Sequence, residues 1–148
     1  METFTGVFPV HEIDFEIATS GRTATPVFSP IKDMENATIS IETGVETWNS
    51  ITEGGWQRAF ATAKSFKVSM NGKRSVGDAG NDYVANMAYS TGKDCESTMK
   101  ITFPNGDVLT GNVVVSVTEG GGGDATKVAP LAFDLISDGK PEYKPATA

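Results

Sequence analysis

Residues 98–117 read TMKITFPNGDVLTGNVVVSV, which is two apolar alternations on either side of a turn. The apolar residues of 99–103 alternate with lysine and threonine, and those of 113–117 repeat with the same spacing after the turn. A period of two places one face of a strand on a core and the other face outside. Between the runs, Pro104-Asn105-Gly106-Asp107 combines a proline of fixed φ with a glycine that tolerates positive φ. The stretch therefore predicts a β-hairpin.

Three further segments alternate in the same way, namely residues 39–41, 66–70 and 131–135. The sequence thus predicts five strands, and Asn71-Gly72 is expected to end the strand over 66–70. A chain of 148 residues has room for one ordinary domain and its core. We therefore expect a single, mainly β domain spanning residues 1–148.

One segment, residues 77–92, breaks this pattern. Four of its side chains fall at the spacing of one helix face: Tyr83, Val84, Met87 and Ala88. This spacing predicts an α-helix of about three turns over residues 79–90, packed against the sheet. Either Asp78 or Asn81 can cap the first amide groups, and Gly92 suits the left-handed residue that ends many helices.

Residues 44–63 are less regular and are predicted to form a long loop. Trp48 and Trp56 lie in this segment on either side of Gly54-Gly55, and Phe60 follows. Two tryptophans in such a segment are explained by a small satellite core. They are explained equally by the apolar centre of a protein interface, in which tryptophan is enriched. The sequence leaves both interpretations open.

Four consecutive glycines, residues 120–123, are followed by Asp124. A phosphate-binding loop would continue into Gly-Lys-Ser/Thr and a helix, whereas this run continues into an acid and an alternating strand. The segment that follows is too short to fold as a separate domain. We therefore predict a flexible connection between two strands of one sheet.

The two ends of the chain differ from its middle. Residues 1–12 are predicted to form an N-terminal arm, and residues 138–148, rich in proline and polar residues, an extended C-terminal tail. The first residues lack the charged opening and apolar stretch of a signal peptide. No run approaches the roughly 18 apolar residues of a membrane span. We expect synthesis in the cytoplasm and no membrane partner.

Acidic residues outnumber basic ones by 19 to 12, which leaves a formal net charge of −7 at pH 7. This balance disfavours tight binding of nucleic acid, although it permits DNA to pass along the surface. His11 is the only histidine, and Cys95, the only cysteine, is predicted to be a small core residue. The loop over residues 77–82 lacks the alternating ligands and distal glutamate of a calcium site. The sequence therefore predicts no catalytic, cofactor-binding or metal-binding residues.

Several separated stretches occur in a specific order and spacing. They are Asn71-Gly72-Lys73-Arg74, Gly77-Asp78, Asn81-Asp82-Tyr83-Val84-Ala85, Phe103-Pro104-Asn105-Gly106, the glycine run before Asp124, and Ser137-Asp138-Gly139-Lys140-Pro141. Together they resemble the major tail tube protein of long-tailed (siphovirus-like) bacteriophages and prophages of Gram-positive bacteria. The resemblance covers about two thirds of the chain, residues 53–141. The first 50 residues match less distinctly, apart from Trp48.

The resemblance implies a β-sandwich or partly rolled barrel with one flanking helix. It implies a structural virion protein without catalysis, which self-assembles into hexameric rings that stack into a tail tube, a conduit for DNA ejection. The implied partners are further copies of the chain, the tape measure, baseplate or tail-tip and terminator proteins, and DNA in transit. The implied location is the virion tail. The residues expected at subunit contacts are Trp48, Trp56, Phe60, Gly120, Gly121, Gly122, Gly123 and Asp124.

The alternative from another class is a small β-sandwich binding module for a carbohydrate or a host surface protein. Such a module would use Trp48, Trp56 or Tyr83 as a stacking platform in a preformed concave site. An enzyme ranks third, because the sequence offers few candidate residues for acid–base catalysis.

Overall fold

The computed structural model describes residues 5–146. Its strands are β1 Asp14–Ala18, β2 Phe28–Pro30, β3 Met34–Asn49, β4 Gln57–Lys73, β5 Glu96–Thr102, β6 Val108–Glu119, β7 Pro130–Ser137 and β8 Glu142–Lys144. Its helices are α1 Ala79–Ala85 and the 3-10 turns η1 Val10–Glu12, η2 Asn86–Tyr89 and η3 Gly92–Cys95. The predicted mainly β class with a single short α-helix is confirmed for this part of the chain.

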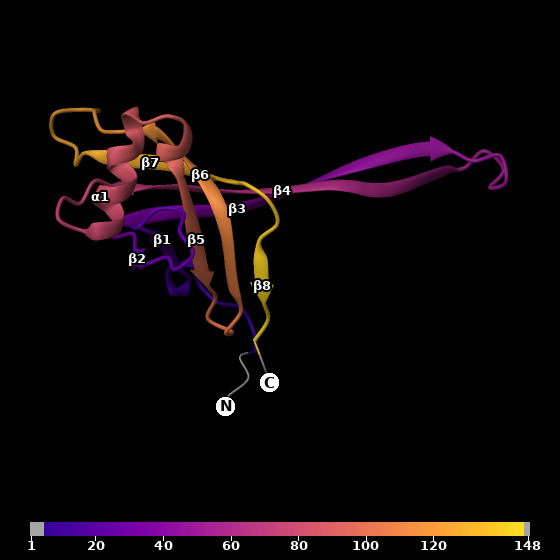
Figure 1. Cartoon of the computed structure of the whole chain (residues 1–148), viewed down its shortest axis with the longest axis horizontal. Coiled ribbons are helices and arrows are strands. Elements are labelled where there is room, and N and C mark those ends of the chain that lie inside the picture. Colours follow the sequence, from indigo (N-terminus) through magenta and orange to yellow (C-terminus); the bar gives the residue numbers. More distant parts are fainter. Residues whose placement is uncertain (1–4, 147–148) are drawn as a thin grey trace.

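All eight strands belong to one antiparallel sheet (Figure 1). The strand order is β2-β1-β5-β6-β7-β4-β3, and the short β8 pairs with β6 beyond the end of β7. β2 and β3 therefore form the two outer edges of the sheet. The helix lies against the sheet at the end far from the long β3–β4 extension (Figure 1).

The five predicted strands all exist, as parts of β3, β4, β5, β6 and β7. The turn at residues 104–107 joins β5 to β6 as predicted. Gly106 has a φ of 98°, and the amide of Phe103 donates to the carbonyl of Asp107 over 2.9 Å. The inward residues of these strands form the core together with Ile17 from β1, Ile31 after β2 and two residues from the helical segment. The buried residues of this core are Ile17, Ile31, Phe66, Val68, Met70, Val84, Met87, Met99, Ile101, Val113, Val115, Leu131, Phe133 and Leu135. Cys95 is buried at the edge of this core, as predicted.

Three strands were not predicted. β1 pairs with β5 and buries Ile17 and Ala18 completely, and β2 pairs with β1. The third, β8, lies within the predicted C-terminal tail, so part of that tail is joined to the sheet. Residues 1–4 of the predicted arm and 147–148 of the predicted tail lie outside the described residues.

The helical segment is shorter than the predicted 79–90. The α-helix ends at Ala85 and continues as the 3-10 turn η2 to Tyr89. Asp78 is the N-cap, because its carboxylate accepts from the amide of Asn81 over 3.0 Å. Gly92 adopts a left-handed φ of 63°, but it begins η3 and does not end the helix.

Asn81, the other predicted cap, is instead a buried polar link. Its amide nitrogen donates to the carbonyls of Lys32 and Lys73, each over 3.0 Å. Its oxygen accepts from the Arg74 guanidinium over 2.9 Å and from the Ser75 amide over 3.0 Å. A fully bonded buried amide of this kind fixes the helix to the end of β4 and the start of β3.

The predicted long loop over residues 44–63 is wrong. β3 and β4 run through it as a continuous antiparallel hairpin, and only residues 50–56 form the connection. The expected end of a strand at Asn71-Gly72 is also wrong, since β4 continues to Lys73. Gly72 is needed inside the strand because a Cβ there would overlap the backbone of Asp33 and Met34.

Candidate assembly interface

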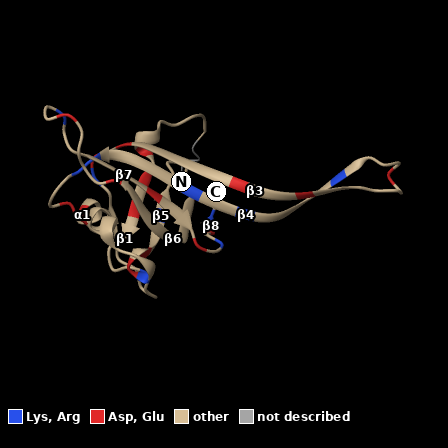
Figure 2. Cartoon of the chain, turned by 90° about the horizontal axis from the view of Figure 1, so that it is seen from above, with Lys and Arg blue, Asp and Glu red and all other residues tan. Residues whose placement is uncertain are grey.

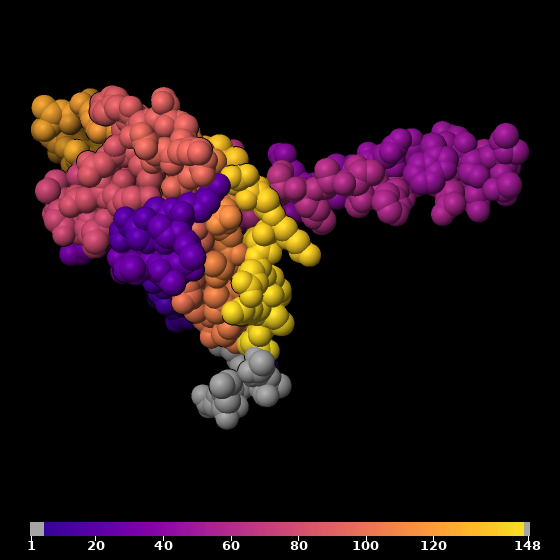
Figure 3. Space-filling model, viewed as in Figure 1, coloured from indigo at the N-terminus to yellow at the C-terminus, as the bar shows by residue number. Residues whose placement is uncertain are grey.

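The β3–β4 hairpin leaves the body of the molecule and projects alone (Figures 1 and 3). β4 pairs with both β3 and β7 over Lys67–Lys73, but with β3 alone from Phe66 to the tip. Residues 40–65 are all exposed except Ser50, which is half-buried. This distal part, residues 40–65, is called the arm hairpin below. It forms a two-stranded ribbon with neither face covered by the rest of the chain.

A β-bulge changes the direction of the side chains halfway along the arm hairpin. Gly44 pairs with Ala63 and Val45 pairs with Ala61, so Thr62 is an extra residue in β4. The hydroxyl of Thr62 donates to the Gly44 carbonyl over 3.2 Å. Because strand side chains alternate, one extra residue transfers every later β4 side chain to the other face. Phe60 therefore faces away from the side that Phe66 occupies.

Regular pairing on the tip side of the bulge places Trp48 and Phe60 on one face of the arm hairpin. Trp48 pairs with Arg58, and Phe60 follows Arg58 by two residues on the same side. The Arg58 guanidinium lies 5.7 Å from the centroid of the Trp48 ring, a cation–π arrangement. Trp48 and Phe60 nevertheless remain 43% and 65% exposed. The satellite-core interpretation of the tryptophans is thus wrong for this structure.

The tip of the arm hairpin is a structured turn with an apolar surface. Gly54 and Gly55 have φ of 68° and 84°, and the Gly55 amide donates to the Ser50 carbonyl over 2.8 Å. Ile51 and Trp56 at this turn are 95% and 80% exposed. Exposed side chains of this size, gathered on one projection, are typical of a protein contact.

The predicted contact residues fall into two separate groups. Trp48, Trp56 and Phe60 lie on the arm hairpin, whereas Gly120 to Asp124 lie in the β6–β7 connection at the opposite end of the molecule (Figure 1). The glycine run does join two strands of one sheet, as predicted. Gly121, Gly122 and Gly123 all have positive φ, between 95° and 128°, a backbone that other residues rarely adopt.

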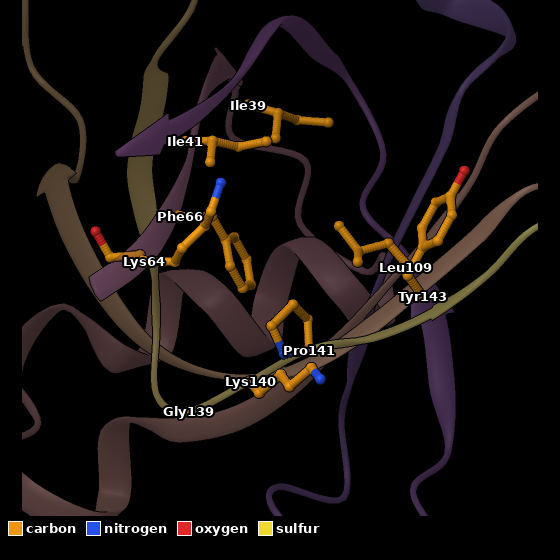
Figure 4. A pocket seen from close by; sticks show the side chains of 10 residues that line it. Ile39, Ile41, Lys64, Phe66, Leu109, Gly139, Lys140, Pro141 and Tyr143 are labelled. Atoms are coloured by element: carbon orange, nitrogen blue, oxygen red, sulfur yellow. The ribbon is translucent and has the colours of Figure 1, made fainter. Parts of the chain in front are cut away.

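An apolar groove of about 700 Å³ lies where the arm hairpin leaves the body (Figure 4). This root groove is lined mainly by Ile39, Ile41, Phe66, Leu109, Pro141 and Tyr143, with Lys64 and Lys140 beside them. The side chain of Phe66 is directed toward Pro141, and both approach Gly111 of β6. This groove was not predicted from the sequence, because its walls come from four segments that lie apart in the chain.

One wall of the root groove is a strap formed by residues 139–146, which include β8. Asp107, in the β5–β6 turn, holds the end of the strap. Its carboxylate accepts from the Tyr143 hydroxyl and from the Ala146 amide, each over 2.7 Å. The hydrogen bond from Ala146, followed by those from Tyr143 and Asn105, lowers the pKa of Asp107. The hydrogen bond that Tyr143 donates to Asp107 raises the pKa of Tyr143.

The acidic loop before the helix is a structural network. Asp78 caps the helix, and the Asp82 carboxylate accepts from the Arg74 guanidinium over 2.7 Å. That hydrogen bond is the largest cause of the lowered pKa of Asp82. Within residues 5–146, no group of three or more His, Cys, Asp and Glu side chains is arranged to hold a metal ion. His11 lies in η1.

No helix in the described part of the chain is long and apolar enough to cross a membrane.

No protein-family model and no curated protein matches this chain. Solved structures match its fold. The chain is similar to one from the tail of an empty GTA particle with C6 symmetry, with a TM-score of 0.76 and 14% identity over 93% of this chain and 99% of that one. A chain from the virion of a native gene transfer agent (GTA) particle gives a TM-score of 0.71 at 14% identity, with the same coverage.

A third match comes from the sheath-tube complex of an extracellular contractile injection system, PVC, in its extended state. It has a TM-score of 0.58 and 13% identity over 95% of this chain and 93% of that one. The chain therefore shares its fold, over nearly its whole length, with chains of tail and injection-system assemblies.

Proposed function

We propose that this chain is a structural tail tube subunit, whose copies assemble into hexameric rings that stack into a tube. The proposal includes no catalytic role. It is supported by the shared fold with chains of tail assemblies, one of which has C6 symmetry.

The arm hairpin is the observation that carries the proposal. Two-stranded ribbons are at best marginally stable in water, and stability normally requires a third strand or a packed face. The arm hairpin has neither, yet it exposes six large apolar side chains: Ile41, Val45, Trp48, Ile51, Trp56 and Phe60. A segment of this kind gains its missing packing from another molecule. In the proposed tube, that molecule is a second copy of the chain.

The outer sheet edges supply a second means of association. β2 and β3 each have one side without a neighbouring strand in the described structure. The long β3 edge presents free amide and carbonyl groups that pair readily with another strand. The β2 edge is less available, because Pro30 has no amide hydrogen and its carbonyl lies against Gly80 of the helix. Pairing of the β3 edge of one copy with a different strand of the next is head-to-tail, and head-to-tail contacts close into a ring when the rotation permits.

The charge of the chain suits a conduit for DNA. With a net charge of −7 per copy, a hexamer carries on the order of −40. A wall with the same sign as the phosphate backbone does not release counterions from DNA, so DNA passes without adhering. A positive electrostatic potential along the lumen of the assembled tube would contradict this part of the proposal.

The proposal also covers the biological setting. It places the subunit in the virion tail of a long-tailed bacteriophage or prophage of Gram-positive bacteria, made in the host cytoplasm. The neighbouring proteins would be the tape measure, baseplate or tail-tip and terminator proteins.

The binding-module alternative finds less support. Arg58 lies over the Trp48 ring, Trp56 is at the convex tip, and Tyr83 lines a separate hollow with Thr19 and Arg22. The three aromatic side chains therefore do not form one concave site. We retain the assembly proposal alone.

Assembly is tested by negative-stain microscopy and light scattering of concentrated protein. We expect rings or tubes for the natural chain, and monomers for the double variant Trp56→Ala, Phe60→Ala. Tyr89→Ala is the matched control, since Tyr89 is 98% exposed but lies on the body. A natural chain that stays monomeric at all concentrations and titrates a specific sugar would overturn the proposal.

A further inference from the structure

We propose that the root groove is the docking site for the tip of the arm hairpin of a second copy. The inserted residues are Ile51 and Trp56, and Glu53 pairs with the lysines at the rim. This inference rests on the proposed self-assembly and names the surface that receives the hairpin.

The root groove is apolar and is not filled by the chain that forms it. Ile41 and Tyr143 on its walls are 68% and 56% exposed, although both side chains are large. Covering apolar surface of this kind stabilises an association by about 25 cal/mol per Å². The hollow also has two firm walls, because β3 and β4 are paired at Ile41 and Phe66, and Asp107 anchors the strap on the other side. A preformed apolar hollow of this kind suits a compact apolar ligand.

The tip cannot fill the groove of its own chain. Ile41 lies in the groove and Asn49 at the start of the turn, so eight residue-to-residue steps along β3 separate them, about 26 Å at 3.3 Å per step. The strand pairing keeps this ribbon extended. The two complementary surfaces are thus held apart within one molecule, and they meet only between molecules.

The chemistry of the tip matches that of the groove. Tryptophan with a neighbouring aliphatic side chain is a typical anchor at the centre of a protein contact. Glu53 is exposed between Ile51 and Trp56 in the sequence of the turn, and acidic and basic residues mark the tip and the ribbon behind it in Figure 2. Lys64 and Lys140 lie at the groove. An acid arriving between two lysines gives a complementary polar rim around an apolar centre.

A second hollow fits the tip less well. It lies between the η2–η3 segment and strands β6 and β7, and it is lined by Met87, Cys95, Val115 and Ile136 together with Lys93 and Glu96. Its rim carries one lysine, Lys93, and the Glu96 carboxylate, which forms an ion pair with Arg22 over 2.9 Å. The root groove presents two lysines to an incoming Glu53.

Docking of tip into groove has a consequence for the assembly. The contact joins two different surfaces, so each copy gives a tip and receives one. Contacts of this heterologous type continue along an axis unless the rotation closes them. The tip and the root groove would therefore connect successive subunits of the tube.

A photo-cross-linking amino acid in place of Thr52, which is exposed at the tip beside Ile51, tests the docking site directly. The assembled variant is irradiated, and the joined peptides are identified by mass spectrometry. We expect cross-links to residues 64–66, 109 and 139–143 of another copy, and the same variant kept monomeric by dilution gives none. Assembly with cross-links elsewhere would overturn the inference and leave the proposed function standing. Failure of the unmodified chain to assemble would instead overturn the proposed function.

A charge reversal provides the second measurement. Glu53→Lys should raise the concentration needed for assembly by roughly threefold, the size expected of an exposed ion pair. The combination of Glu53→Lys with Lys64→Glu and Lys140→Glu should restore assembly. All three residues are exposed, so these variants should fold. Asp94→Lys, which changes an exposed acid on the body in η3, is the matched control. Equal effects of Asp94→Lys and Glu53→Lys would contradict the pairing at the rim.

Discussion

The body of the molecule and its arm hairpin belong to the same sheet but are stabilised differently. In the body, Phe133 and Val68 are completely buried, and β4 has a neighbouring strand on both sides. In the arm hairpin the same β4 keeps only one neighbour, and residues 51–65 are all exposed. The ladder is continuous, so hydrogen bonding alone does not distinguish the two regions. What distinguishes them is side-chain burial, which the body obtains within the chain and the arm hairpin does not.

Hydrogen exchange of the monomer should show the largest difference between these regions. Amides in residues 44–60 should open with a free energy close to zero, while those of residues 66–70 should approach the global stability, about 5–15 kcal/mol for a domain. Assembly should raise protection of 44–60 selectively. Equal protection of the two segments in the monomer would contradict the expected difference in stability between the arm hairpin and the body.

A pair of phenylalanine truncations compares the regions energetically. Phe133→Ala removes a fully buried ring and should lower the free energy of unfolding by about 3–5 kcal/mol. Phe60→Ala should change it by less than about 0.5 kcal/mol, because the ring is 65% exposed. Chemical denaturation of both monomers measures this, and sedimentation should show an assembly defect for Phe60→Ala. A large loss of monomer stability from Phe60→Ala would indicate intramolecular packing of the arm hairpin.

A pair of asparagine substitutions tests how the helix holds the ends of β3 and β4 that lie away from the arm hairpin. Asn81→Ala leaves the carbonyls of Lys32 and Lys73 without their partner and should cost about 1–3 kcal/mol. Asn86→Ala, at an exposed position of η2, is the control and should be nearly neutral. Thermal unfolding of the two variants provides the measurement. Similar melting temperatures for both would show that the buried amide is not an essential link.

The smallest expected effect is a pH dependence of the strap. The pKa of Asp107 is lowered, so its contacts are complete above about pH 4 and are lost as the pH falls through that lowered pKa. The pKa of Tyr143 is raised, so its contact persists below about pH 10 and is lost as the pH rises through the raised value. Both transitions are measurable from the NMR signals of Tyr143 and Ala146. Asp107→Asn should abolish the acid transition, and its persistence in that variant would assign it to another group.

The sequence predicted the body far better than the arm hairpin. Alternation at residues 66–70 and 131–135 is visible because one face of each strand meets the core. In the arm hairpin neither face is buried, so no such selection acts, and the extra Thr62 also interrupts the alternation. The Gly54-Gly55 pair between two runs that contain threonine, valine and aromatic residues is a hairpin signal, although the segment was predicted to be a loop.

Other features differed in how far the sequence could reveal them. Phe15 and Ile17 alternate with Asp14 and Glu16, so β1 had a short but readable signal. No sequence signal showed that Asn81 is buried, because a buried asparagine and a capping asparagine occupy the same place in a helix sequence. The root groove depends on tertiary placement of β6 and the strap, which local pattern does not encode.

The bulge at Thr62 makes the arm hairpin sensitive to changes in length. Deleting this single residue would leave Trp48 paired with Arg58 and on one face with Phe60, but it would remove the bend and the added twist that a bulge gives to its strand. The body, whose strands lie beyond the deletion, would keep its own register. A one-residue deletion here would therefore change the direction in which the tip projects from the body without altering the core.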